Sequence, residues 1–306
     1  MSLWASAKQP EQKVAAGDVL SSTRCSGEAP RTLVYDTEAA ALAVGPHVPG
    51  HLAGLTVAVE DGHTVYALTT LGEDMPLSLE ALSWAPCTRD AEEPGLPTHE
   101  WSWKSVAAPP PPFGKAAAIV AYAVHPDGRT VFVSTRDAGG GGGEGTYSFD
   151  GKRGEWRWHG AWVLPFRGQG YFDVDLDAWV GLHEEPGYVC CCQVASRGGT
   201  SAAPPDSDKV AEKLFCKGGE GAHLGATLTY VGDSRFCLVE SVVRGDAESA
   251  CDGCLVRVTM FGLKFNRMGK LRTTSHRTTN SYAVPKYGTT FSPILAFCMY
   301  YLHSKI

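Results

Sequence analysis

The sequence predicts an all-β protein, and three observations support this prediction. Short runs alternate in polarity and are rich in valine, tyrosine, phenylalanine, tryptophan and threonine. Glycine, aspartate and proline separate these runs, as they do in turns between strands. No segment shows the apolar spacing that an amphipathic helix of three turns requires. We therefore expect antiparallel sheets along most of the chain.

A hairpin of two short strands recurs four times. In the first two copies the turn contains Asp61-Gly62 or Asp127-Gly128, and this pair favours the positive φ that tight hairpin turns need. The third and fourth copies turn around Leu176 and Asp233. The four predicted hairpins span residues 56–68, 121–133, 171–182 and 227–239.

Each hairpin is followed by a second pair of strand-like runs, so the repeating unit has four strands. After the third hairpin, the last strand is expected near Ala211–Cys216. Four strands at this spacing are typical of a propeller blade, which can bury both faces only against neighbouring blades. The other predicted strands are 78–85, 101–106, 146–150, 155–159, 188–195, 255–263 and 271–276.

One stretch resembles a kelch repeat. The glycines of 139–143, followed by Tyr147, Asp150 and Trp156, match the double glycine, spaced tyrosine and tryptophan of that repeat. In kelch-type propellers the ring is often closed by one blade that pairs N-terminal with C-terminal strands, which leaves no open edge. On this resemblance, residues 31–44 complete a blade begun by residues 280–302. The expected fold is a kelch-like β-propeller of about five four-stranded blades, with six as the alternative.

The chain as a whole is similar to a group of uncharacterised kelch-like and F-box-like proteins of cereal grasses. This resemblance spans about residues 31–285 and implies a propeller fold and a binding role, but no reaction. It points to the substrate-receptor half of a ubiquitin ligase. The F-box itself is not seen here, so an adaptor role would need another chain. The segments that carry the resemblance are 34–38, 101–106, 165–173 and 276–282.

We expect a disordered N-terminal tail over residues 1–29 and a single propeller domain over residues 30–306. The first residues lack the continuous apolar core of a secretory signal, and the run Pro293–Leu302 is too short for a membrane-spanning helix. A cytoplasmic or nuclear protein with no membrane partner is therefore expected. The end Ser304-Lys305-Ile306 differs only in its last residue from the peroxisomal signal Ser-Lys-Leu, which leaves a peroxisomal alternative.

The net charge of −6 is unevenly distributed. Residues 253–306 contain eight basic residues and no acidic ones, whereas the rest of the chain has 19 basic and 33 acidic residues. The basic residues are spread along this segment, so we interpret them as a solvated face balanced by the acidic remainder. Nucleic acid is not favoured as a partner.

The cysteines do not indicate a metal site or a cofactor. Cys251 and Cys254 form a lone CxxC motif with no second ligand pair at the spacing that structural zinc requires. Cys190, Cys191 and Cys192 lie in a strand-like run, where alternation sends neighbours to opposite faces. We expect packing residues and free thiols, with no metal and no cofactor.

The candidate binding surface is the connection Trp162–Gly170, which leads from the second unit to the third and would lie near the propeller axis. Arginine and aromatic residues are enriched at binding hot spots, and glycines let a partner approach the backbone. The alternative is that Trp162 and Phe166 only seal the gap between blades. The candidate binding residues are Phe166, Arg167, Gln169, Tyr171 and Asp173.

The sequence thus favours a non-catalytic module, a monomer that binds another protein through its loops. The alternative is an enzyme of lyase or hydrolase type. Asp173, Asp175 and Asp177 alternate along the third hairpin, and two carboxylates on one strand face could act as acid and base at a propeller channel. Aspartate is also a common turn former, and this role is the favoured interpretation of Asp175 and Asp177. No catalytic residue is assigned.

Overall fold

The computed structural model describes residues 31–36, 41–49, 52–58, 64–70, 77–86, 99–114, 117–137, 144–217, 223–243 and 254–284. All the regular elements in these ranges are β-strands, which confirms the all-β prediction. No helix among these residues has the length and hydropathy needed to cross a membrane. The predictions for the N-terminal tail, for the glycine run, for Cys251 and for the C-terminal tripeptide lie outside the described residues.

The strand bounds follow the predicted pattern closely. Within the described ranges the strands are β1 (Arg31–Asp36), β2 (Ala41–His47), β3 (Leu52–Ala58), β4 (Thr64–Thr70), β5 (Leu77–Pro86), β6 (His99–Ser105), β7 (Ala117–Val124), β8 (Thr130–Asp137), β9 (Gly145–Asp150), β10 (Glu155–Gly160), β11 (Phe166–Asp173), β12 (Ala178–His183), β13 (Val189–Gln193), β14 (Ser207–Lys209), β15 (His223–Gly232), β16 (Arg235–Val243), β17 (Cys254–Phe265) and β18 (Leu271–Val284).

These strands form four antiparallel meanders of four strands each and one separate pair. The first meander is β3–β6, the second β7–β10, the third β11–β14 and the fourth β15–β18, while β1 pairs with β2. All four predicted hairpins are confirmed, because β3, β7, β11 and β15 each pair with the next strand. The predicted repeating unit of four strands is therefore present four times.

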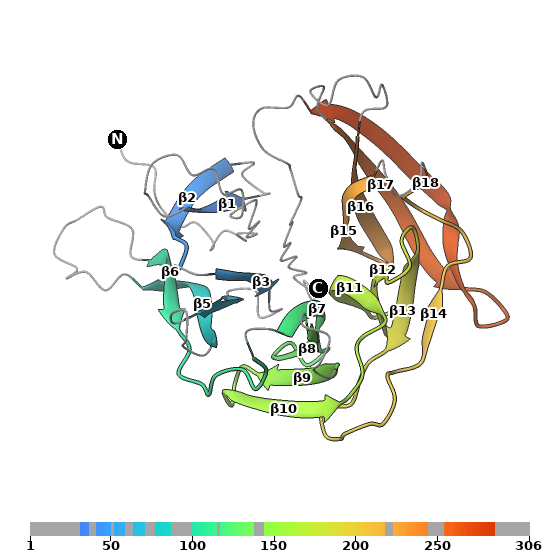
Figure 1. Cartoon of the computed structure of the whole chain (residues 1–306). Helices are drawn as coiled ribbons and strands as arrows, with labels where there is room; N and C mark the ends of the chain where they lie inside the picture. The colour runs from blue at the N-terminus through green and yellow to red at the C-terminus, as the bar shows by residue number, and fades with distance from the viewer. Residues whose placement is uncertain are drawn as a thin grey trace, which may run out of the picture.

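The first strands of the meanders lie next to one another. β3 contacts β7, β7 pairs with β11, and β11 contacts β15. In Figure 1 the meanders follow one another around a common centre, where these first strands lie, and the last strands β6, β10, β14 and β18 lie at the periphery. Successive meanders thus pack face to face.

Two predicted strands differ from the structure. The last strand of the third meander is the short β14, not Ala211–Cys216. That segment is irregular, and its residues Leu214, Phe215 and Cys216 are buried in the core between the third and fourth meanders. Asn280–Val284 belongs to β18 and pairs with β17, so it does not begin a separate closing blade.

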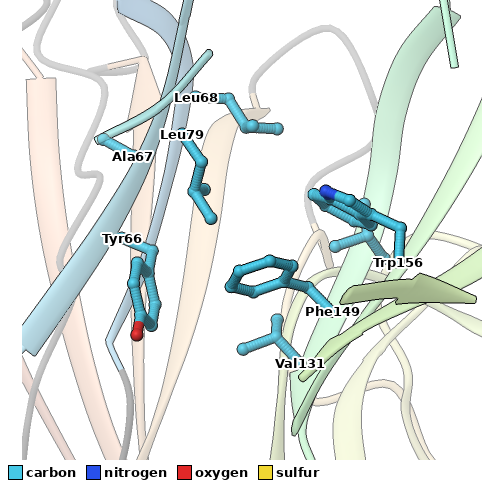
Figure 2. A pocket seen from close by; sticks show the side chains of 8 residues that line it. Tyr66, Ala67, Leu68, Leu79, Val131, Phe149 and Trp156 are labelled. Atoms are coloured by element: carbon cyan, nitrogen blue, oxygen red, sulfur yellow. The ribbon is translucent and has the colours of Figure 1, made fainter. Parts of the chain in front are cut away.

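Three apolar clusters fill the spaces between successive meanders. The third and fourth meanders share the largest cluster, which includes Phe236 and Phe261. The second and third share a cluster around Trp179. Between the first and second lies a cluster with a cavity of about 20 Å³, lined by Tyr66, Phe149 and other side chains that Figure 2 shows. This volume holds about one water molecule, so the cavity is a packing gap and not a ligand site.

The three consecutive cysteines of β13 confirm the packing role predicted for them. Cys191 points into the cluster shared with the fourth meander, whereas Cys190 and Cys192 point into the cluster on the opposite face. Burial raises the pKa of the Cys191 thiol to about 11 and raises those of its two neighbours as well. All three are free thiols that stay protonated at neutral pH.

Candidate functional site

The five residues predicted to bind a partner all lie on β11, but the structure divides them into buried and accessible residues. Phe166 is 2% exposed and packs in the cluster around Trp179, so it seals the seam between the second and third meanders. Asp173 is completely buried. Arg167 is exposed and Gln169 is half-buried. Tyr171 is also half-buried, so Arg167, Gln169 and part of Tyr171 offer surface to a partner.

The second half of the predicted connection is a strand with a bulge. The register of β11 against β12 shifts between Arg167 and Tyr171, and the intervening residues pair in parallel with β7. Gly168 has a φ of 67°, which a glycine adopts without strain. This bulge lets β11 leave β12, reach β7, and join the second and third meanders into one sheet of eight strands.

Tyr171 lies at the inner end of the seam between the third and fourth meanders. Burial raises the pKa of its hydroxyl far above the ordinary tyrosine value. The hydroxyl faces Thr229 on β15, but the two groups do not form a hydrogen bond of good geometry. Tyr171 therefore supports the packing of the inner strands and stays neutral.

Arg167 lies beside an exposed network of charges. Arg136 donates to Glu184 over 2.6 Å and to Glu144 over 2.7 Å. The hydrogen bond from Arg136 is the main cause that lowers the pKa of Glu184, and the charge of Arg167 contributes. None of the ion pairs between described residues includes Arg167, so its guanidinium is available to a partner.

Asp173 is buried and hydrogen-bonded in this structure. Its Oδ1 accepts hydrogen bonds from the backbone N–H groups of Asp175 and Leu176, at 3.1 and 2.9 Å. It also accepts one from the Ser234 hydroxyl, at 2.8 Å. Asp177, with a φ of 47°, lies in the same turn, which supports the turn-forming interpretation. In the described part of the chain, no group of three or more histidine, cysteine or acidic side chains could hold a metal ion.

A larger concave surface lies near the C-terminal end of β11, between the third and fourth meanders. We call it the seam groove. It is an open cavity of about 520 Å³ whose walls come from the β11–β12 turn, from β13 and the loop after it, from β14, and from the end of β17. Its lining residues are Leu176, Asp177, Ala178, Cys191, Cys192, Gln193, Val194, Asp206, Ser207, Asp208 and Phe265.

Exposed apolar side chains occur in the lining of the seam groove and in two turns that adjoin lining residues in the sequence. Val174 is 72% exposed in the β11–β12 turn, and Met268 is 84% exposed in the turn that follows β17. Phe265, in the lining itself, is 41% exposed. The Asn266 side chain fixes the second turn, because its Oδ1 accepts hydrogen bonds from the N–H groups of Met268 and Lys270, at 2.9 and 3.0 Å. The turn after β17 therefore holds Met268 in water.

The lining of the seam groove is acidic. It contains three aspartates and no lysine, arginine or histidine. Asp208 has a structural role, since its Oδ2 accepts a hydrogen bond of 2.8 Å from the N–H of Leu271, and its other oxygen lies 3.8 Å from Lys270 Nζ. Asp177 and Asp206 are exposed, and their carboxylates take part in none of the hydrogen bonds or ion pairs of the described residues.

The two walls of the seam groove are fixed relative to each other. Ser234 on the fourth meander bonds to Asp173 on the third. Arg277 Nη2 donates to the carbonyl of Leu214 over 3.0 Å, and the largest apolar cluster fills the space between the sheets. The groove is thus preformed, which lowers the entropic cost of binding.

Sequence reasoning did not find the seam groove, because its residues come from four separate parts of the chain. One local signal was available. Val174 and Met268 are apolar residues in turns, where polar residues and glycine are usual. Such residues either turn inward or stay exposed, and only the structure shows that both stay exposed.

Fold and site together define an all-β protein of stacked four-stranded meanders with a preformed, acidic groove between two of them. The chain belongs to the family described as protein of unknown function DUF1668, whose model matches residues 12–282. The match includes nearly all the described strands. A comparison with curated proteins finds no match.

Proposed function

We propose that this chain is a kelch-like β-propeller that binds another protein and has no catalytic role. The order of the meanders supports the ring, because each first strand contacts the first strand of the next meander. The pair β1–β2 supplies two strands of a fifth blade, whose other strands lie outside the described residues.

The far face of the fourth meander supports this ring closure. One face of the sheet packs on the third meander through Leu238 and Phe261. The opposite face carries Val239, Val256 and Val258, of which Val239 is only 8% exposed. A sheet that is apolar on both faces needs a neighbour on each side. A closing blade would provide the second neighbour.

The observation that carries the binding role is the seam groove, with exposed Phe265 in its lining. A rigid scaffold that holds loops in fixed positions is the usual basis of recognition. Scattered exposed apolar residues need no explanation, but Phe265 is exposed in the lining of a concave surface, and Val174 and Met268 are exposed within three residues of lining residues in the sequence. Exposed apolar surface is unfavourable in water. Its burial against a partner would therefore favour binding.

The enzymatic alternative needs Asp173 or another carboxylate at a propeller channel. Three hydrogen bonds occupy the Oδ1 of Asp173 and the side chain is fully buried, so Asp173 is not an accessible carboxylate. No other observation favours catalysis, so we propose the binding role alone.

Quantitative pull-down with the full-length chain tests the binding role. We expect the wild type to recover the same partner protein as a Leu224→Glu control, which changes a half-exposed apolar residue outside the seam groove. A double variant, Val174→Glu with Met268→Glu, should lose that partner while it keeps its melting temperature. Recovery of no protein above background by the wild type would overturn the proposed function. Retention of the partner by the double variant would leave the function and remove the seam groove from it.

A further inference from the structure

The seam groove has the size of a site for a peptide segment. Its volume of about 520 Å³ lies within the range of about 300–1,000 Å³ that is usual for ligand sites. Several side chains fit in this space, but a folded domain does not. A partner would therefore place an extended segment or a loop in it.

The negative charge of the seam groove favours a positively charged residue in such a segment. Asp177 and Asp206 lie on different parts of its wall and have no cationic partner among the described residues. Carboxylates along a cleft with apolar walls concentrate the electrostatic field, which favours a lysine or arginine and repels acidic groups. Phosphate-bearing ligands and nucleic acids are disfavoured for the same reason.

Exposed apolar side chains in and after β17 favour an apolar residue in the bound segment. Phe265 is within the lining, and Met268 follows it in the adjoining turn. Methionine is flexible and polarizable and adapts to apolar side chains of different shapes. An apolar residue next to the cation of the segment would cover these two side chains.

We propose that the seam groove binds an extended segment of a partner protein that carries lysine or arginine next to a large apolar residue. This inference rests on the proposed protein-binding function and names the chemistry of its partner. The cation pairs with Asp177 and Asp206, and the apolar residue packs on Phe265 and Met268. Asp208 stays engaged with the backbone of β18 and contributes only its charge.

Fluorescence anisotropy with labelled ten-residue peptides tests the inference. The probes are a peptide of alternating lysine and leucine, one of glutamate and leucine, and one of lysine and serine. We expect the lysine–leucine peptide to bind at least about tenfold more tightly than either of the others, because each lacks one of the two interactions. Its affinity should fall with rising salt.

Variants locate the site. Asp177→Asn with Asp206→Asn should weaken binding of the lysine–leucine peptide by about tenfold or more. Asp233→Asn is the matched control, because Asp233 is also an exposed turn aspartate with positive φ but lies outside the lining. It should bind the peptide like the wild type.

Equal binding of the three peptides would overturn the inference, and so would wild-type affinity in the double asparagine variant. If either result is found while the pull-down still recovers a partner, the proposed function stands and the chemistry assigned to its partner is wrong. If the pull-down recovers nothing, the proposed function is wrong, and the inference that rests on it is wrong as well.

Discussion

The Ser234 hydroxyl donates a 2.8 Å hydrogen bond to the buried carboxylate of Asp173, and thereby ties the hairpin turn of the fourth meander to that of the third. The two residues are 61 positions apart. Ser234 has a φ of 52°, in the left-handed region that its own tight turn requires. A residue that the sequence suggests for binding or catalysis is therefore a link between two sheets.

Replacement of Asp173 by alanine should lower the free energy of unfolding by about 2–3 kcal/mol. The change removes the acceptor of three hydrogen bonds and leaves two backbone N–H groups and a buried hydroxyl without it. Ser234→Ala should cost about 1 kcal/mol, since it removes one of the three bonds. Urea denaturation measures both changes. An Asp173→Ala midpoint equal to that of the wild type would show that Asp173 does not link the sheets.

Gly170→Ala and Gly181→Ala should each destabilise the fold by about 1–3 kcal/mol through overpacking. Both glycines pack on the buried ring of Phe166, and a Cβ on Gly181 would lie 2.6 Å from its Cγ. Gly199→Ala is the control, because a Cβ there meets no atom within 4 Å. Thermal unfolding followed by circular dichroism compares the three. A melting temperature of Gly181→Ala at or above that of the control would contradict the packing of Phe166.

Stability should fall as the pH is lowered from 7 towards 5, and His159 should contribute to this loss. Its Nδ1 donates to the carbonyl of Gly199 over 2.9 Å and its Nε2 accepts from the Ser148 hydroxyl over 2.8 Å, an arrangement that fits the neutral ring. Burial lowers the pKa of His159 below 6.5 in the folded state. The unfolded chain therefore binds a proton below about pH 6.5 that the folded chain does not, so the contribution is complete above this pH and is lost below it.

Urea titrations at several pH values test the role of His159. Its replacement by glutamine should flatten the dependence of the unfolding free energy on pH between 7 and 5, whatever its effect at neutral pH. The control is His276→Gln, at an exposed position. Burial also lowers the pKa of His125 and His183, so part of the slope should remain. Identical slopes in wild type and His159→Gln would exclude a contribution from His159.

The double change Arg167→Ala with Gln169→Ala should leave the unfolding free energy within about 0.5 kcal/mol of the wild type. Arg167 is exposed and without an ion pair among the described residues, and Gln169 is half-buried beside it. Urea denaturation and the pull-down are measured on the same variant. Unchanged recovery of the partner by a folded variant removes this surface from the binding site, whereas a large loss of stability shows that the two side chains belong to the packing of β11.

Local sequence patterns were sufficient for most strands. The four hairpins were predicted because each combines alternating apolar residues with a turn that contains aspartate or glycine. β14 was missed because Ser207–Lys209 is short, polar and without alternation. Apolar residues that follow it, such as Leu214 and Phe215, indicated a strand but are buried in irregular structure, where they fill the space between the third and fourth meanders.

The candidate site was predicted only in part from the sequence. Arg167 and Gln169 were identified from residue type, and the structure leaves both at the surface. Phe166 and Asp173 have equally suitable side chains, yet both are buried. Residue type and strand periodicity cannot tell which side chains of β11 are buried. Each face of a sheet in this fold is covered by another sheet, which is formed by a distant part of the sequence.

The sequence by itself determined the strands, their turns and the repeat of four, because these depend on residues a few positions apart. Backbone pairing within a meander and the positive φ of a turn are local properties. Only the tertiary structure decided which strand faces meet, that Asp173 is tied to Ser234, and that Asp177, Asp206 and Phe265 share one groove. Burial and electrostatic environment are set by contacts between distant segments, and these form only when the sheets pack on one another.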